Sequence, residues 1–563
     1  MYCPECGTKL PKGSLFCPEC GTNVSVYTSK SCAQDYAYRL LLVTKYEALA
    51  RKYKTTLEEI VSVLQAVISR LQEASVDAVL LDVSEITEDG ENWEEYKKAM
   101  VHAIEQQGWA KGPDTYVMII GGDDCVPMPR VSNPKYTKDD PIGLKKLHCD
   151  TMYSMDYMPY TYDFTGGNDS LTLYQKYEDV DFVISRLPLP EDADCENEAF
   201  TFEEDMNAYF DKAIPKLSGI EVNRVIMTSA QVWIPASTYM VEGLPSINIS
   251  RYLPSSAREG NVVVAPEVSI KNEDVYSKYS DAYREADLVL FNLHGSDAPS
   301  GTAYYGQRGN DYPSVVVPGK IGYTSAGIIT TCACFGARFV GYPRYASMLL
   351  ASLYEPNNNI VLFAGSCSIA YGGSPHAFSE TMLKIYTDYL MSGMSAGQAW
   401  EKAKLDYLQT TSDNIRGALA TFLMFNLYGV PMLHVKTNNQ SKYKKSIMED
   451  KQSSVTRTCS EERTTLFKRN PETNSMDILS EVRNAVDANL AAIRQTIEKE
   501  LYEKLGLSAD DLTSIESYVS TDSNGVQQKG YYFNYAQKND LFTNRIYAQT
   551  DEKGKILKTE HTK

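Results

Sequence analysis

The sequence predicts an α/β protein with a mostly parallel sheet covered by helices on both faces, preceded by a small cysteine-rich segment and followed by a small α+β domain. Short apolar runs alternate with helical stretches through most of the chain. Two near-identical Cys-x-x-Cys units open the sequence, and an amphipathic helix followed by strand-like runs closes it. Apolar strands interleaved with helices are typical of parallel sheets, because the crossover helices bury both sheet faces.

The apolar runs predicted to be strands of this sheet are 78–83, 116–121, 181–185, 224–228, 288–293, 327–331 and 360–364. The expected helices are two within 35–75, followed by 92–107, 198–215, 273–285, 376–391, 394–408 and 414–426. Near the C-terminus, apolar residues from Ile478 to Leu505 recur every three or four positions, which predicts one long amphipathic helix. Strand-like runs at 514–520, 529–536, 543–550 and 555–560 then predict a meander.

Composition and charge exclude several classes of function. The chain has 563 residues, of which 43% are hydrophobic and 23% charged, so it is an ordinary globular protein of several domains. The net charge of −18 argues against nucleic acid or an anionic membrane as the main partner. The sequence shows no long apolar run and no secretory signal, so we expect a cytoplasmic protein whose 12 cysteines are kept reduced.

The N-terminal cysteines predict a structural zinc site. Cys3 and Cys6 form one Cys-Pro-Glu-Cys-Gly unit, and Cys17 and Cys20 form a second one. Two such units supply the four thiolates that zinc prefers in a closed, tetrahedral shell. A fragment this short cannot bury a sufficient core, so the metal must provide most of its folding energy. The spacing resembles the zinc-ribbon family. Calcium has no comparable oxygen-ligand motif in the sequence.

We therefore expect the following division of the chain. A zinc ribbon spans 1–23 and a polar linker spans 24–34. The next segment, 35–109, belongs to the N-terminal part of the α/β unit, whose main part spans 110–436. The segment 437–470 is a basic linker, because the stretch from Lys436 to Asn470 has nine Lys/Arg against four Asp/Glu. The helix and meander occupy 471–563.

Two strand ends have the residue types of an active site. The run Leu288-Val-Leu-Phe-Asn-Leu-His294-Gly295 ends in His-Gly, and the run Ile328-Ile-Thr-Thr-Cys332-Ala-Cys334 ends in Ala-Cys. The carboxyl ends of parallel strands lie at one edge of the sheet, so a histidine and a cysteine at two such ends can face each other. The imidazole then takes or returns a proton while the thiolate attacks a carbonyl. The backbone amides of Gly295 and Cys334 are candidates for binding the oxyanion.

At this point the sequence resembles the gingipain family, cysteine peptidases of the caspase-like clan, over about residues 110–436. The matching segments are Val117-Met-Ile-Ile-Gly-Gly-Asp-Asp-Cys-Val-Pro127, Cys149-Asp-Thr-Met-Tyr153, Asp181-Phe-Val-Ile-Ser-Arg-Leu-Pro188, the His-Gly and Ala-Cys strands, Ile360-Val-Leu-Phe-Ala-Gly-Ser-Cys-Ser-Ile-Ala-Tyr371 and Tyr428-Gly-Val-Pro-Met-Leu433. The resemblance implies a caspase-like fold and peptidase activity.

The resemblance also implies roles for particular residues. His294 falls on the family's catalytic histidine and Cys334 on its nucleophile, with Cys332 as the competing cysteine. Asp150 matches an acidic residue that selects a basic side chain, and its alternative role is that of a turn or capping aspartate. The pocket wall is Gly365–Gly373, with Ser366 and Ser368 as substrate-binding residues. The family's histidine-orienting acid is replaced by Cys125, which leaves Asp123 or Asp124 as candidates.

These observations lead to a cysteine endopeptidase that cleaves after Arg or Lys. Its partners are protein or peptide substrates, and its exposed basic linker is a candidate for self-processing. The alternative is a catalytically silent scaffold that binds a protein partner through the zinc ribbon, and the intact His-Gly and Ala-Cys pairs argue against it. Cys125, Cys149 and Cys367 fall in segments near the same site, where oxidation is expected to inhibit the enzyme.

Overall fold

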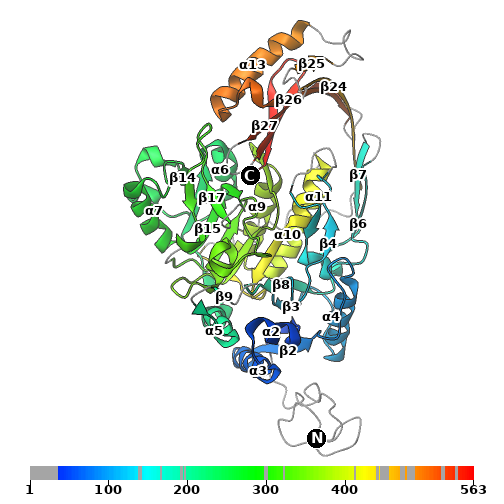
Figure 1. Cartoon of the computed structure of the whole chain (residues 1–563), viewed down its shortest axis with the longest axis vertical. Helices are drawn as coiled ribbons and strands as arrows, with labels where there is room; N and C mark the ends of the chain where they lie inside the picture. The colour runs from blue at the N-terminus through cyan, green and yellow to red at the C-terminus, as the bar shows by residue number, and fades with distance from the viewer. Residues whose placement is uncertain are drawn as a thin grey trace, which may run out of the picture.

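The structure is a computed structural model, and it describes residues 36–136, 143–164, 168–190, 194–195, 198–296, 302–320, 324–410, 414–438, 440, 443, 456–469, 476–478, 488–521, 527–538 and 543–562. Its main part is a large central sheet with helices packed against it, and a second sheet lies across one end of the molecule (Figure 1). The predicted zinc ribbon and the linker that follows it lie outside the described residues. None of the helices in the described ranges is both long and apolar enough to cross a membrane.

The central sheet has 11 strands, and neighbouring strands are parallel except at two places, β13–β14 and β20–β22. In spatial order the strands are β13 (Arg258–Glu259), β14 (Val262–Ala265), β12 (Val225–Ala230), β15 (Leu288–Asn292), β19 (Ile328–Thr331), β20 (Leu362–Ser366), β22 (Phe425–Gly429), β8 (Val183–Leu187), β3 (Thr115–Ile120), β1 (Tyr38–Thr44) and β2 (Val76–Asp82). All the strands that the sequence predicts for this sheet are present, so the predicted mostly parallel α/β architecture is confirmed.

Burial along the strands shows that both sheet faces are covered. Every residue of β3, β8, β12, β15, β19, β20 and β22 is buried, although successive side chains point to opposite faces. The α-helices of this part are α2 (Tyr46–Tyr53), α3 (Leu57–Glu73), α4 (Glu94–Gln106), α5 (Phe202–Ala213), α6 (Ile234–Val241), α7 (Glu273–Glu285), α8 (Met348–Tyr354), α9 (Phe378–Met391), α10 (Ala396–Thr410) and α11 (Ile415–Met424). Among them, α9 contacts α6, α10 and α11, whereas α5 contacts α3 and α8.

Two predicted helices of the α/β unit have different bounds in the structure. The segment 35–75 contains the two predicted helices, α2 and α3, but the first begins only at Tyr46. Residues 38–44 before it form strand β1, because Leu40–Val43 are consecutive buried residues between β2 and β3. The predicted helix 414–426 ends at Met424, and the chain continues directly into strand β22. A short apolar run fits a buried helix and a buried strand equally well, and only its neighbours in space decide between them.

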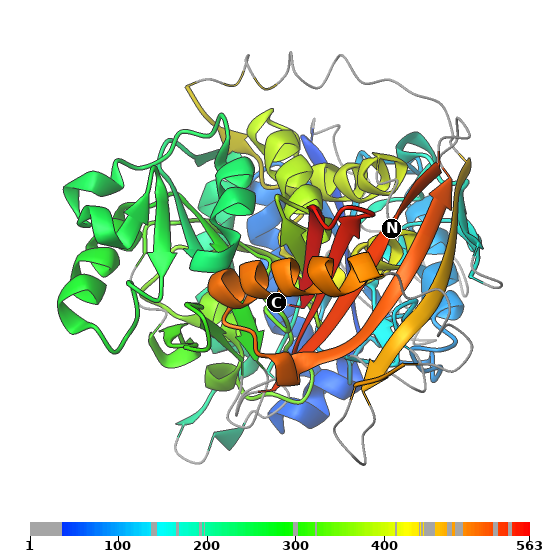
Figure 2. The ribbon, with the colours of Figure 1, turned by 90° about the horizontal axis from the view of Figure 1, so that it is seen from above.

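The second sheet has nine strands and joins the C-terminal part to the rest of the molecule. Eight strands follow one another in the order β21 (Tyr371–Ser374), β29 (Ile556–Thr562), β28 (Thr543–Asp551), β27 (Gln527–Lys538), β26 (Leu512–Thr521), β24 (Thr456–Arg469), β7 (Asn168–Leu173) and β6 (Tyr160–Asp163), and β25 (Met476–Ile478) pairs with β24. The α/β unit thus contributes a strand at one end of this sheet and two at the other. Figure 2 shows the sheet crossing the molecule, with helix α13 (Ala488–Leu505) lying along it.

The predicted C-terminal strands are all present, and α13 packs its apolar side chains against them. Leu490, Ile493, Ile497 and Leu501 form a buried cluster with Ile515 and Phe533 of the sheet. At the start of the predicted helix, Ile478 belongs instead to strand β25, and residues 479–487 lie outside the described residues. The expected basic linker, 437–470, contains β24, whose residues pair with β7 on one side and β26 on the other. Its residues lie in an extended strand between two neighbours, a pairing that composition alone does not reveal.

Four short sheets complete the described structure, and the first of them carries the predicted catalytic histidine. It contains β16 (His294–Ser296), β17 (Ala303–Tyr305) and β18 (Ser314–Val316). The other three are pairs: β4 (Arg130–Ser132) with β5 (Lys146–His148), β9 (Asp194–Cys195) with β10 (Glu198–Ala199), and β11 (Ile220–Glu221) with β23 (Val435–Lys436).

Candidate active site

The parallel register between β15 and β19 brings the predicted histidine and cysteine together. Leu288 pairs with Ile328 and Phe291 with Thr331, so each residue of β15 lies opposite the residue 40 positions later. His294 and Cys334 are separated by the same number of residues and follow the ends of the two strands. The backbones of Gly295 and Cys334 lie so close that a Cβ atom on Gly295 would overlap the Cys334 carbonyl. Glycine at this position is therefore a requirement of the close approach.

The Cys334 thiol is held in a tight turn. Its Sγ accepts a hydrogen bond from the backbone N–H of Ala370, at 3.2 Å, and lies 3.6 Å from the Ala370 carbonyl oxygen. Phe335 has a φ of 52°, in the left-handed region, and its N–H donates to the carbonyl of Ser368 at 2.8 Å. The N–H and the carbonyl of Ala370 together fix the position of the sulfur in this turn.

Cys332, the competing cysteine, has a different environment. Its side chain is fully buried, and its Sγ lies 3.8 Å from the Sδ of Met240 in α6. Its backbone N–H donates to the carbonyl of Phe291 and so continues the ladder between β15 and β19. These contacts are those of a small core residue, and the geometry therefore favours Cys334 as the nucleophile.

The His294 ring is enclosed by aromatic side chains and held by an amide. It is fully buried, with the ring centroids of Trp233 and Tyr312 at 4.3 and 5.1 Å. Its Nε2 lies 2.7 Å from Oε1 of Gln307, a residue that is itself 1% exposed. Gln307 follows β17, which pairs with the strand that begins at His294.

The partners of Gln307 assign the proton on the histidine. Its Nε2 donates to the carbonyl of Gly309 at 3.1 Å and to the hydroxyl of Tyr312 at 2.9 Å. The amide oxygen must then accept from His294, so Nε2 of the histidine carries a proton. In the neutral imidazole this leaves Nδ1 as the basic nitrogen. The Gln307 side chain thus orients the imidazole and fixes its tautomer, as an acidic residue would.

Neither acidic residue predicted to orient the histidine contacts it in the described contacts. Asp123 accepts hydrogen bonds from the Arg130 guanidinium and from the N–H of Met128, and Asp124 pairs with Lys52 at 3.0 Å. The sequence offers little sign of Gln307, which is one polar residue in a Gly-rich loop after a short strand. Only the antiparallel pairing of β16 with β17 brings that loop back to the histidine.

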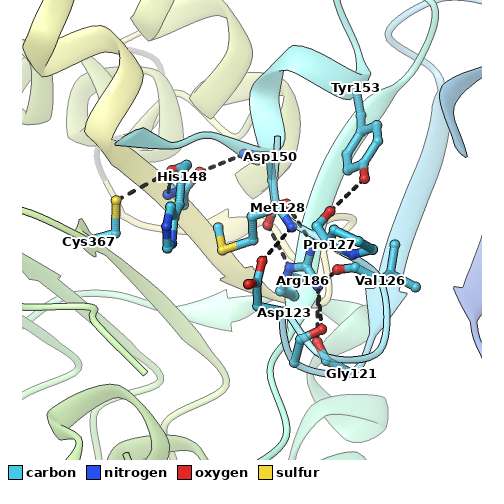
Figure 3. Close-up of polar contacts among 12 residues, drawn as sticks. Gly121, Asp123, Val126, Pro127, Met128, His148, Asp150, Tyr153, Arg186 and Cys367 are labelled. Carbon is cyan, nitrogen blue, oxygen red and sulfur yellow. Dashed lines mark hydrogen bonds and ion pairs between the residues drawn. The ribbon is translucent and has the colours of Figure 1, made fainter. Parts of the chain in front are cut away.

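Asp150 is not open to a substrate in this structure. The carboxylate is 2% exposed and accepts two hydrogen bonds from Arg186, at 2.8 Å from Nε and 2.7 Å from Nη2 (Figure 3). Burial alone lowers the pKa of Arg186, but the charge and hydrogen bonds of Asp150 outweigh it and raise the pKa. The same guanidinium donates to the carbonyls of Gly121, Gly122 and Val126. This geometry argues against the predicted role of Asp150 in selecting basic side chains and assigns the residue to the core.

The predicted substrate-binding serines brace the turn beside the nucleophile. Both are buried, and the hydroxyl of Ser366 donates to the carbonyl of Ser368 while it accepts from the Ser368 N–H. The hydroxyl of Ser368 accepts from the N–H of Leu144. Both hydroxyls thus form hydrogen bonds with the backbone around Cys334. A substrate contact would be an additional hydrogen bond of the same hydroxyl.

The other three cysteines in the segments that resemble the gingipain family have buried side chains. Burial raises the pKa of Cys125 and Cys149, and it raises the pKa of Cys367 to about 12. Oxidation of a cysteine requires an accessible thiolate. The structure therefore argues against the expected inhibition of the protein by oxidation at these three positions.

The predicted zinc ligands Cys3, Cys6, Cys17 and Cys20 lie outside the described residues. Within the described part of the chain, no group of three or more His, Cys, Asp or Glu side chains is arranged to hold a metal ion.

Two models of known protein families match separate parts of the chain. The model described as "Peptidase family C25" matches residues 42–436, well over half of the chain, and the model of a zinc-ribbon domain matches residues 2–24. The first match begins closer to the N-terminus than the resemblance seen in the sequence and includes the last three residues of β1. Among curated proteins, none matches the chain. A solved structure described as "Structure of Protease" is 11% identical, with a TM-score of 0.43 over 95% of this chain and 99% of that one, a likeness too low to carry an argument.

The buried pair of Asp150 and Arg186 predicts a large loss of stability when it is broken. Asp150→Asn leaves the guanidinium buried without its counter-charge, which should cost about 3–5 kcal/mol of unfolding free energy. The measurement is urea unfolding followed by circular dichroism. Asp124→Asn is the control, because its ion pair is about half exposed on the aspartate side and should contribute less than about 1 kcal/mol. Equal unfolding midpoints for the two variants would contradict the structural role.

Proposed function

The chain belongs to peptidase family C25 and is therefore a cysteine peptidase, and we propose that Cys334 is its nucleophile and His294 its general base and acid. The observation that carries this assignment is the meeting of the two strand ends, where the backbone of Gly295 touches that of Cys334. The N–H of Ala370 supports the Cys334 sulfur, and Gln307 holds the imidazole with Nδ1 as its basic nitrogen.

The proposed reaction uses each of these groups in turn. His294 takes the thiol proton as Cys334 Sγ attacks the carbonyl carbon of the peptide. The backbone amides of Gly295 and Cys334 are the proposed donors to the oxyanion. The imidazolium then gives its proton to the leaving amine, and an acyl-enzyme remains on Sγ. His294 next deprotonates water, which attacks the acyl carbon, and the thiol regains its proton when the acid product leaves.

The N-terminal ribbon is proposed to hold structural zinc through Cys3, Cys6, Cys17 and Cys20. Four thiolates close a tetrahedral shell, so this metal would fold the ribbon and take no part in hydrolysis. The peptidase acts on protein or peptide substrates, and the ribbon is a candidate for binding a protein partner. A protein with this thiol chemistry fits the reducing conditions of the cytoplasm.

The preference for Arg or Lys was expected from the carboxylate of Asp150. That carboxylate is already paired with Arg186, so it does not support the preference. A basic preference would require another acidic group near the segment Gly365–Gly373. The specificity is therefore best decided by comparing substrates that end in Arg, Lys, Asp or Leu before the reporter group.

Replacing the two neighbouring cysteines separates the nucleophile from the core residue. Cys334→Ala should lower kcat by at least about 10³-fold on every substrate that the wild type cleaves, because the covalent step is lost. Cys332→Ala is the matched control two residues away, and its kcat should stay within about threefold, since it changes only packing. The measurement is hydrolysis of the four fluorogenic substrates. The assignment fails if the Cys332 variant loses activity and the Cys334 variant keeps it.

Gln307 is proposed as a positioning residue for His294. Gln307→Leu removes the acceptor for Nε2 and should lower kcat by about 10- to 100-fold with little change in KM. Gln307→Glu keeps an acceptor and adds a negative charge, which raises the pKa of His294. The acid limb of its pH–rate profile should then move to higher pH, because the protonated histidine is not a base. An acid limb at the same pH in the wild type and the Glu variant would contradict this role.

Self-processing is proposed for the segment 439–455, because residues 456–469 of the expected linker form strand β24. Purified wild type should separate into two chains, cut after one of the basic residues Lys442, Lys444, Lys445 or Lys451, while Cys334→Ala stays intact. Mass spectrometry of both proteins after incubation is the measurement. Wild type that stays at 63 kDa while it cleaves a basic peptide would exclude self-processing.

A further inference from the structure

The strand β21 starts at the nucleophile and is placed to bind the main chain of a substrate. Ala370, whose N–H contacts the Cys334 sulfur, is followed directly by Tyr371, the first residue of β21. A peptide with its scissile carbonyl at Sγ and its preceding residues extended would therefore run beside β21. An extended peptide adds to an open strand edge through main-chain hydrogen bonds, which require no particular side chains.

That edge of β21 is already occupied by strand β29 of the same chain. The two strands are antiparallel, with Tyr371 opposite Thr562 and Ser374 opposite Thr559. Strand β29 thus runs toward Ala370 and the nucleophile, in the direction that the residues before a scissile bond would take. The packing is tight, since a Cβ atom on Gly373 would lie 2.6 Å from the carbonyl oxygen of Thr559.

Side chains hold β29 against the peptidase unit. Glu560 accepts a hydrogen bond from Nδ2 of Asn414 at 2.8 Å, and Lys558 lies 3.2 Å from Glu560 and over the ring of Phe378. Burial alone raises the pKa of Glu560, but the charges of Lys558 and Lys135 outweigh it and lower the pKa. Glu560 is therefore a charged anchor for the strand.

Lys135 links the two parts on the other side of β21. Its ammonium group lies 5.2 Å from the ring centroids of both Tyr371 in β21 and Tyr547 in β28. The ammonium can thus attract one ring from the peptidase unit and one from the C-terminal sheet at the same time.

The same sheet also covers the histidine. The hydroxyl of Tyr312, which accepts from Gln307, donates to Oε1 of Gln537 in β27 at 2.7 Å. His561 of β29 lies with its ring centroid 6.2 Å from that of Trp233, which packs on His294. His294 is completely buried and Cys334 is 4% exposed. The C-terminal sheet thus closes the site on both sides, through these contacts beside His294 and through the pairing of β29 with β21 beside Cys334.

We propose that β29 is a built-in competitor for the substrate main chain, so that the chain described here is the latent form of the peptidase. This inference rests on the proposed function, because it assigns β21 as the docking strand of that site. Hydrolysis then requires β29 to leave β21, and an extended peptide takes its place.

Departure of β29 leaves the catalytic groups in position. Gln307 keeps its bonds to Gly309 and Tyr312, which belong to the peptidase unit, and Ala370 keeps its contact with Cys334. The C-terminal sheet therefore controls access to the site without supplying a catalytic group. This form of control needs only the difference in free energy between the docked and the released strand.

The test weakens the anchor of β29 and follows Cys334 with two probes. Glu560→Ala removes the bond to Asn414, and Glu560→Ala/Lys558→Ala removes the contact with Phe378 as well. Lys529→Ala is the control, because Lys529 is exposed in strand β27 of the same sheet. One probe is iodoacetamide, which needs no strand edge, and the other is a peptidyl acyloxymethyl ketone, which does. Hydrogen exchange of the β29 amides reports release of the strand in the full-length protein.

The expected result is labelling of Cys334 by the peptidyl probe at least about 10-fold faster in the Glu560 variants than in wild type, because the competent fraction rises. Iodoacetamide labelling should rise by a smaller factor, because this probe gains from opening of the site but not from the freed strand edge, and the Lys529 variant should behave as wild type. Faster exchange of β29 without faster peptidyl labelling would overturn the proposal. Labelling as expected, with no hydrolysis by any variant, would support the docking of β29 and overturn the proposed catalysis instead.

Discussion

The parallel register between β15 and β19 is the constraint on which the site depends. Each residue of β15 lies opposite the residue 40 positions later in β19. The residues that follow the two strands are therefore neighbours, and His294-Gly295 and Cys334 meet at one sheet edge. A shift by one residue would turn the side chains of a strand to the opposite face. Complete burial of both strands prevents such a shift, because it would exchange well-packed side chains for poorly packed ones.

Polar groups around this edge are fixed by the backbone rather than left for a ligand. Arg186 joins Asp150 to three carbonyl groups, and Ser366 and Ser368 bond to the turn that contains the nucleophile. Such groups hold the loops between strands in one arrangement, since a buried donor or acceptor that loses its partner is costly. The residues that identify the family by their order in the sequence are, in large part, this internal framework.

The C-terminal sheet changes how the site is understood. A helix and meander without catalytic groups resemble an independent domain when only the sequence is considered. In the structure, β29 pairs with β21 and β24 pairs with β7, so the meander is hydrogen-bonded to the peptidase unit at both ends. An unpaired strand edge binds another strand readily, and the C-terminal strand satisfies the edge that begins at the nucleophile.

The sequence by itself determined seven of the 11 strands of the central sheet, the match of motifs to the gingipain family and the His-Gly and Ala-Cys strand ends, because apolar runs and short motifs are local signals. It placed the first strand, Tyr38–Thr44, in a helix, since a short apolar run has no period of its own. Only the tertiary structure decided that Asp150 belongs to Arg186, that Gln307 holds His294 and that β29 covers β21. Each of these contacts joins residues whose pairing depends on how strands and loops meet in space, and the sequence carries no local record of it.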